Sequence, residues 1–252
     1  MSNINITQEQ KPVILVDSVS VQYRVPHEQL SGIKEYVIRW LQNRLQYKKF
    51  WALKDVFLDI QRGEFFGIVG RNGAGKSTLL KTMARVIKPT LGRVVILGRT
   101  APLLDLGAGF HPELSGRENI FLNGALLGLT QKTVGHRFDE IVAFSEIGEF
   151  INAPLRTYST GMVARLGFAV ATSVRPDIML VDEVLSVGDT QFQEKCLARM
   201  NAFREQGTTI VLVSHSMERV KALCERAIWL EDGKVAAQGK VSAVVGQYLQ
   251  AL

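Results

Sequence analysis

Two spacings of apolar residues alternate along the chain and predict strands interleaved with helices. Short, continuous apolar runs at residues 65–69, 178–181 and 208–213 predict strands that are buried on both faces. Helical spacing follows the first run, from about residue 76 to residue 86. Residues 112–151 are predicted to be mostly helical, with glycine breaks at residues 116, 124, 128, 135 and 148. Strands that alternate with helices form a mainly parallel sheet covered on both faces, so we expect an α/β fold.

The two ends of the chain have other patterns. Residues 13–23 have the β-branched residues and the partial alternation of an edge strand, and strand-like composition returns at residues 51–60. Near the other end, Asp232-Gly233 between two apolar stretches is a strong hairpin signal. Residues 241–252 then read as a helix. We therefore expect strands near the N-terminus, and a hairpin that leads into a helix near the C-terminus.

Composition is that of an ordinary globular protein. The 252 residues, 46% of them hydrophobic, suffice for one large α/β domain or for a core with a small subdomain. Residues 1–12 are polar, and we expect them to be flexible. No apolar run reaches the roughly 18 residues needed to cross a bilayer, and the N-terminus lacks the pattern of a signal peptide. Cys196 and Cys224 stand alone, which favours reduced thiols in a cytosolic protein.

The net charge of +6 is concentrated in one segment. Residues 24–49 contain six Lys or Arg against two Glu, and apolar residues have helical spacing across residues 33–45. Trp40 suits an interface and the nearby cations suit anionic headgroups, so this helix is predicted to dock on a membrane partner or on the inner leaflet. Packing of the helix on its own domain is an equal alternative. Charge alone is also compatible with a nucleic-acid ligand.

A glycine-rich loop carries the strongest chemical signal. Residues 70–77 match G-x-x-x-x-G-K-[ST] at every fixed position, and they lie between a predicted strand and a predicted helix. Glycines let backbone N–H groups turn toward phosphate oxygens, and the helix N-terminus adds positive partial charge. Lys76 would reach the outer phosphates, and the Ser77 hydroxyl would bind Mg²⁺. The residues expected to contact the nucleotide are Gly70, Asn72, Gly73, Ala74, Gly75, Lys76, Ser77 and Thr78.

Two carboxylates and a histidine follow predicted core strands. Asp182 ends the apolar run at residues 178–181, which is how a P-loop enzyme places its second contact to Mg²⁺. Glu183 comes next and is the natural general base for an attacking water. His215 ends the next predicted core strand, where it could orient the γ-phosphate and the water.

A second anion site is predicted at residues 158–162, Tyr-Ser-Thr-Gly-Met, about twenty residues before Asp182. Ser159 and Gly161 precede an Ala/Leu/Val-rich helix, and a serine, a glycine and a helix N-terminus together favour an anion. The P-loop already surrounds the phosphates from one side. We therefore expect this second site to complete the pocket of a partner molecule.

In the order and spacing of these motifs, residues 13–240 resemble the nucleotide-binding domain of ATP-binding-cassette (ABC) proteins. The resemblance implies a RecA-like α/β P-loop core, an N-terminal antiparallel β subdomain and a helical signature subdomain at about residues 112–160. A basic insertion would occupy residues 24–50, and a C-terminal helix residues 241–252. It also implies ATP and Mg²⁺ as ligands, and closure of a homodimer around two nucleotides.

The resemblance assigns further residues. Residues 158–162 are similar to the family's signature and residues 186–189 to its D-loop, and Tyr23 resembles the aromatic that stacks on adenine, with Trp51 as a rival. Three departures stand out: Thr160 and Met162 replace the usual Gly and Gln, Gly188 replaces a leucine, and no glutamine lies between Arg93 and Phe110. Asp105 is the nearest polar substitute for that glutamine.

Residues 103–110 and 113–120 resemble a narrower group, the bacterial ABC exporters of lipid-linked polysaccharide such as O-antigen and teichoic acid. This resemblance implies a homodimer that works with two copies of a separate multi-span membrane subunit, which would handle the lipid-linked glycan. It places the chain peripherally on the cytoplasmic face of the bacterial inner membrane, without a nucleic-acid partner.

Other functions have less support in the sequence. The alternative of another class is a soluble ABC ATPase acting on nucleic acid or ribosomes, which the basic charge would suit. The single cassette argues against it, the signature argues against a small-molecule kinase, and the lack of an Asn-Lys-x-Asp element argues against a GTPase. Residues 239–252 are too few to form an independent domain, which needs roughly 40 residues. We therefore expect no glycan-binding β-sandwich, and substrate choice to rest with the membrane partner, the carrier lipid or a separate binding protein.

Overall fold

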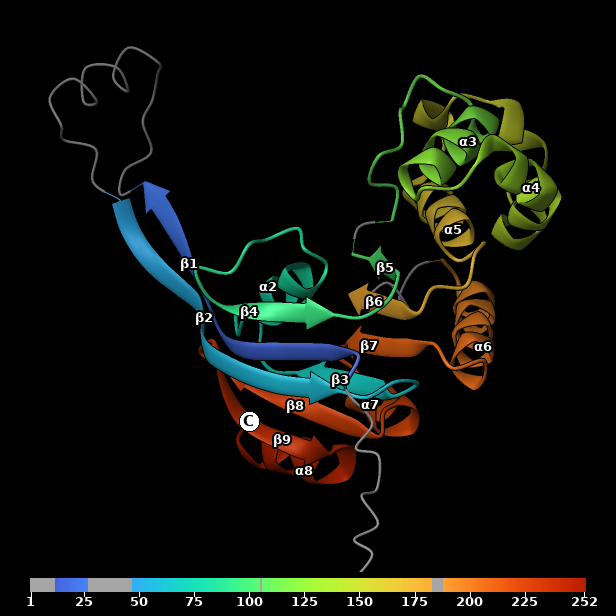
Figure 1. Ribbon diagram of the computed structural model, residues 1–252. Helices are drawn as coiled ribbons and strands as arrows, with labels where there is room; N and C mark the ends of the chain where they lie inside the picture. Colours follow the sequence, from blue (N-terminus) through green and yellow to red (C-terminus); the bar gives the residue numbers. More distant parts are fainter. Residues whose placement is uncertain (1–11, 27–46, 105, 183–187) are drawn as a thin grey trace, which may run out of the picture.

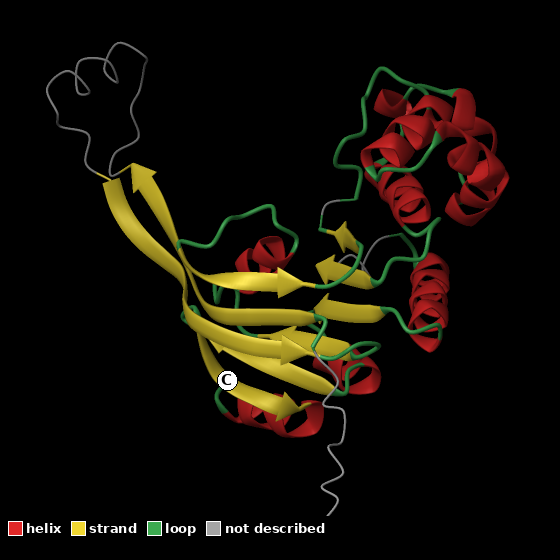
Figure 2. Cartoon of the chain, viewed as in Figure 1, coloured by secondary structure: helices red, strands yellow, loops and turns green. Residues whose placement is uncertain are grey.

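The computed structural model describes residues 12–26, 47–104, 106–182 and 188–252. Two sheets form the body of the molecule, and a group of helices projects beyond the end of the larger sheet (upper right in Figure 1). Figure 2 shows the same division, with the strands gathered in the body and most of the helices at its margins. The predicted α/β class is confirmed.

The larger sheet has six strands in the order β5-β6-β7-β3-β8-β9, and all of its neighbouring pairs are parallel except β8 with β9. Its strands are β3 (Phe65–Val69), β5 (Thr100–Leu103), β6 (Ile178–Asp182), β7 (Thr209–Val213), β8 (Arg226–Glu231) and β9 (Lys234–Lys240). The three apolar runs predicted as buried strands are confirmed as β3, β6 and β7.

Strand β3 is apolar on both faces because a separate core lies on each side of it. Phe65 and Val69 pack into a core with the helices α6 (Thr190–Glu205), α7 (Met217–Leu223) and α8 (Val241–Gln250). Phe66 and Ile68 pack into a second core with helix α2 (Lys76–Met83) and the second, smaller sheet. A central strand with helices over one face and a sheet over the other has no face left for polar residues.

The smaller sheet is antiparallel and has the order β2-β1-β4, with β1 at Ile14–Pro26, β2 at Tyr47–Ile60 and β4 at Leu91–Ile96. The prediction that residues 13–23 form an edge strand is therefore wrong, because β1 is the middle strand. Alternation of apolar residues reports that one face is buried, and it says nothing about how many neighbours a strand has. The predicted helix at residues 33–45 lies outside the described residues, although Pro26 and Tyr47, which flank residues 27–46, are paired in the ladder.

Helix α2 (Lys76–Met83) lies between the sheets and contacts β1, β2, β4, β6 and β7. It ends earlier than the predicted residue 86. The N–H of Ala84 still bonds to the carbonyl of Leu80, but Arg85 has a left-handed backbone with φ of 60°. A residue in that conformation ends a helix even where apolar residues continue at helical spacing.

The projecting helices are α3 (Gly116–Leu126), α4 (Gln131–Ser145) and α5 (Thr160–Ala171), with the 3-10 turns η1 (Gly148–Asn152) and η2 (Leu155–Thr157). Helix α3 begins with a capping box between Ser115 and Glu118. Helix α5 contacts both α3 and α4, so this helical group continues past residue 160. The prediction that the glycines at 124 and 135 break helices is wrong, because Gly124 lies within α3 and Gly135 within α4. A Cβ on Gly124 would lie 2.4 Å from a methyl group of Val134, so this glycine allows α3 and α4 to approach closely.

The hairpin predicted at Asp232-Gly233 joins β8 to β9, and both residues have positive φ. Helix α8 follows it, as predicted for the C-terminal segment. Among the described helices, none is long and apolar enough to cross a bilayer.

Candidate functional site

The glycine-rich loop leaves β3 and enters α2, as predicted, and its glycines have conformations that other residues rarely adopt. Gly70, Gly73 and Gly75 have φ values of 148°, 80° and 103°. A Cβ on Gly70 would lie 2.3 Å from the carbonyl oxygen of Leu230, and one on Gly75 would lie 2.6 Å from that of Ala52. Leu230 on β8 and Ala52 on β2 therefore leave no room for a side chain, and glycine is the only residue that fits at these two positions.

Lys76 is the first residue of α2, and its side chain reaches back to the start of the loop. Its side chain is buried, and Nζ donates to the carbonyl oxygens of Gly70 at 2.8 Å and Arg71 at 2.9 Å. Ser77 and Thr78 follow in the first turn, where Ser77 is exposed and Thr78 half-buried. A fixed ammonium group beside backbone N–H groups at a helix N-terminus is a site suited to phosphate.

Three predicted site residues meet at one edge of the larger sheet. Asp182 is the last residue of β6 and pairs with Val213 at the end of β7, and His215 follows two residues later. Strand β7 also pairs with β3, which leads into Gly70. Because these strands are parallel, their carboxyl ends face the same side, where α/β sheets bind ligands. Glu183 lies outside the described residues.

The residues present fit a magnesium ion. Helix α2, which carries Ser77 in its first turn, contacts β6, which ends at Asp182. One carboxylate and one hydroxyl are a normal protein contribution to Mg²⁺, which keeps several waters and binds phosphate oxygens as well. Among the described residues, no group of three or more His, Cys, Asp or Glu side chains is placed to hold a metal by itself.

The two candidate adenine partners lie on adjacent rungs of the β1–β2 ladder. Tyr23 pairs with Phe50, and Trp51 pairs with Gln22. Since successive residues of a strand point to opposite faces, Tyr23 and Trp51 face opposite sides of the sheet, and only one of them can stack on a given base. Phe50, which is not among the predicted site residues, shares the face of Tyr23 and is 54% exposed.

The signature residues open α5, as predicted. Ser159 is the N-cap, and its hydroxyl accepts a hydrogen bond from the N–H of Met162 at 3.2 Å. Ser159 and Gly161 line a pocket of 330 Å³ together with Arg165 and Gly188. Small-molecule sites begin at roughly 300 Å³. No described residue of the P-loop lines this pocket, so the two anion sites of one chain are separate.

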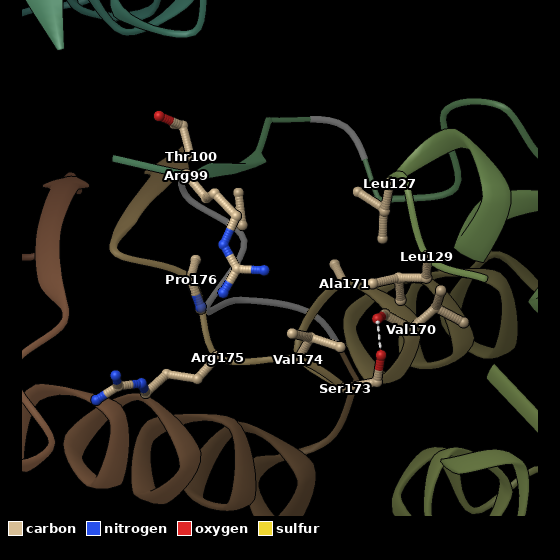
Figure 3. Close-up of a pocket in the computed structure, with 11 residues that line it drawn as sticks. Arg99, Thr100, Leu127, Leu129, Val170, Ala171, Ser173, Val174, Arg175 and Pro176 are labelled. Carbon is tan, nitrogen blue, oxygen red and sulfur yellow. Dashed lines mark hydrogen bonds between the residues drawn. The ribbon is translucent and has the colours of Figure 1, made fainter. Parts of the chain in front are cut away.

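A second pocket is too small for a nucleotide. Its volume is 70 Å³, room for a few water molecules, and Leu127, Val174 and Pro176 line it together with Arg99 and Arg175 (Figure 3). It lies between the starts of β5 and β6 and the end of α5, away from the carboxyl edge of the sheet.

The two cysteines are buried and are not joined by a disulfide. Burial raises the pKa of the thiols of Cys196 and Cys224 to about 12. Neutral, enclosed thiols are poor nucleophiles and poor metal ligands, so we assign them to packing alone.

Similarity to known proteins supports the nucleotide site that the geometry indicates. The ABC transporter family matches residues 53–186. The chain is 46% identical over 244 residues to an O-antigen export system ATP-binding protein, RfbB, of Klebsiella pneumoniae, a match that covers 96% of this chain and 99% of the relative. It is 46% identical over 198 residues to a teichoic acids export ATP-binding protein, TagH, of Bacillus cereus, covering 79% of this chain and 36% of the relative.

Among solved structures, a dimeric post-hydrolysis state of an ATP-binding cassette bound to ADP and Pi is similar, with a TM-score of 0.71 and 25% sequence identity. That match covers 90% of this chain and 98% of the other. The predicted fold of a P-loop cassette is therefore confirmed.

Proposed function

The chain belongs to the ABC transporter family of ATP-binding cassettes, and from this premise we propose that it is the ATP-hydrolysing motor of a bacterial exporter of lipid-linked polysaccharide. The observation that carries the proposal is the 46% identity to an O-antigen export ATP-binding protein over almost the full length of both chains. O-antigen, teichoic acid or a related cell-surface glycan is the substrate class of the exporter.

Each motif then has a role in the proposed cycle. Backbone groups of the P-loop and Lys76 bind the phosphates of ATP. Bound Mg²⁺, held by Ser77 and Asp182, would neutralise charge on the outer phosphates. Glu183 accepts a proton from the attacking water, and His215 orients the γ-phosphate. Tyr23 is proposed to stack on the adenine.

The proposed assembly is a homodimer in which Ser159 and Gly161 of one copy face the P-loop of the other. Support comes from the separation of the two anion sites within one chain and from the dimeric cassette that the fold resembles. Two copies of a separate multi-span membrane subunit form the transport path and handle the lipid-linked glycan. The motor would then lie peripherally on the cytoplasmic face of the inner membrane.

Removal of this chain from its host is expected to stop delivery of the polysaccharide to the cell surface. Lipid-linked polysaccharide should then accumulate inside, because synthesis would continue without a motor for export. Surface glycan and the intracellular lipid-linked pool can be measured by gel analysis and mass spectrometry. Complementation with Lys81→Ala, a change on the exposed side of α2, should restore export. Normal surface glycan together with defective ribosomes or nucleic-acid binding would favour the soluble ATPase instead.

The shared pocket predicts complementation between two inactive chains. A Lys76→Ala chain lacks the P-loop cation, and a Gly161→Asp chain places a negative charge where the partner's phosphate would bind. Their heterodimer has one intact site and one doubly damaged site. In a mixture of equal amounts with random pairing, about a quarter of the sites should be intact, and ATPase activity should return in proportion. Absence of recovery, with heterodimers proven by mass spectrometry, would count against the shared pocket.

A further inference from the structure

Arg165 lies on α5, six residues after Ser159, where three helices meet. Its Nη1 donates to Oε2 of Glu146 at 2.8 Å, just beyond the end of α4. Its Nη2 donates to Oδ2 of Asp189 at 2.8 Å, at the start of α6. The guanidinium also stacks 4.8 Å from the ring centroid of Phe192, and the side chain is only 19% exposed. A planar group with two carboxylate partners and one aromatic partner has little freedom to move.

At one end of this cluster of Arg165, Glu146 and Asp189, the side chain of Asp189 caps the start of α6. Asp189 is the N-cap, and its Oδ1 accepts a hydrogen bond from the N–H of Phe192 at 2.9 Å while its other oxygen binds Arg165. Both partners hold the pKa of Asp189 below its usual range, the Phe192 N–H more strongly than Arg165. Gly188, with φ of 76°, lies so close that an added Cβ would be 3.2 Å from Phe192 and 3.4 Å from Nε of Arg165.

The Glu146 end connects the same arginine to the helical group. Glu146 caps α4 in a left-handed conformation, and its Oε1 accepts from Nζ of Lys195 on α6 at 2.8 Å. Lys195 also donates to the carbonyl of Phe144 at 3.1 Å. Two cations therefore face two carboxylates, so the cluster does not present a net charge to a phosphate. Its effect on the neighbouring pocket must be geometric.

We propose that Arg165 is a positioning residue that holds the signature turn at a set distance from the Gly188–Asp189 segment. Ser159, Gly161, Arg165 and Gly188 all line the pocket of 330 Å³, and Arg165 bonds to Asp189, the residue that follows Gly188. The inference rests on the proposed function, in which this pocket receives the phosphate presented by the second copy. Misplacement of the signature turn would then slow hydrolysis without affecting the P-loop that binds ATP first.

Asp189→Asn tests this inference without removing the helix cap, because Asn caps helices about as well as Asp. We expect kcat to fall about tenfold, since small displacements of positioning groups cost that much or more, and KM for MgATP to stay within about twofold. Thermal stability should hardly change, because Asp189 is 64% exposed and an ion pair with a solvent-exposed partner contributes little to folding. Arg165→Gln should give a similar fall in kcat. The double variant should have a kcat no lower than that, since both changes break the same contact between Arg165 and Asp189. Arg93→Gln, which breaks the exposed pair with Asp17, is the matched control and should leave kcat unchanged.

Mixing experiments separate this inference from the proposed function. Arg165→Gln and Lys76→Ala chains should complement each other, because Arg165 positions a signature that serves the other copy. Gly161→Asp with Lys76→Ala is run in parallel. Recovery in the Gly161 mixture alone would overturn the role of Arg165 and leave the shared pocket standing. Failure of both mixtures would overturn the shared pocket and this inference with it. Wild-type kcat in Asp189→Asn, or losses that multiply in the double variant, would also overturn it.

Discussion

Replacing Glu183 by Gln is expected to lower kcat for ATP hydrolysis by on the order of 10²–10⁴, the usual effect of removing a positioned general base. Glu183 follows Asp182 in the sequence, and Asp182 is the last residue of β6, at the edge of the sheet where β7 and β3 also end. Gln keeps the size of the side chain but cannot accept a proton from water. Binding of MgATP should remain intact, because the P-loop and Asp182 are unchanged.

Steady-state ATPase assays and equilibrium binding of a fluorescent ATP analogue measure the two effects separately. Glu194→Gln is the control, because Glu194 is an exposed carboxylate on α6 and the change removes the same charge from the chain. Turnover near the wild-type rate in Glu183→Gln would remove this residue from the role of general base. A loss of ATP binding in the same variant would instead indicate a role in holding the nucleotide or its metal.

Lys76→Ala is expected to give the second large effect, a loss of kcat/KM on the order of 10²–10³, which is typical when one preorganised charged donor is removed. The Lys76 side chain is buried and its Nζ donates to the carbonyls of Gly70 and Arg71, so the ammonium group is already held against the loop. Exchange of these carbonyl contacts for phosphate oxygens requires little movement of the ammonium group. Both nucleotide affinity and turnover should therefore fall.

Lys81→Ala distinguishes this loss from a general effect of charge or of helix stability. Lys81 lies on the same helix but is exposed in its last turn, so its removal should leave kcat/KM within about twofold, as is usual for surface changes away from special features. Thermal denaturation of both variants shows whether folding is preserved. Full ATPase activity in Lys76→Ala, with a normally folded protein, would contradict a P-loop function for this segment.

Much of the candidate site could be predicted because its motifs depend on short stretches of chain. Gly70 and Gly75 have positive φ, which is a local requirement for glycine, although Leu230 and Ala52 also leave no room for a side chain there. Lys76 and Ser77 follow because a helix starts there. Asp182 and His215 could be assigned to one edge because each follows a buried apolar run, and parallel strands end together. Such rules do not require knowledge of the neighbouring elements.

Predictions failed where the answer depended on a distant neighbour. The middle position of β1 depends on β4, which lies more than sixty residues later in the chain. Gly124 was predicted to break a helix, whereas it lies within α3 and provides room for Val134 of the next helix. The Arg165 cluster escaped detection because Glu146 and Asp189 are 19 and 24 residues away from the arginine, with no spacing rule that relates them.

The sequence by itself determined the α/β class, the phosphate loop and the strand-end carboxylate, since hydrophobic period, glycine φ requirements and helix starts are local properties of the chain. Only the tertiary structure decided which face Tyr23 and Trp51 occupy, and that Gly188 and Arg165 line the pocket beside Ser159 and Gly161. These features depend on strand register and on side chains that meet across several helices. Such contacts form when elements pack together, and no single segment specifies them.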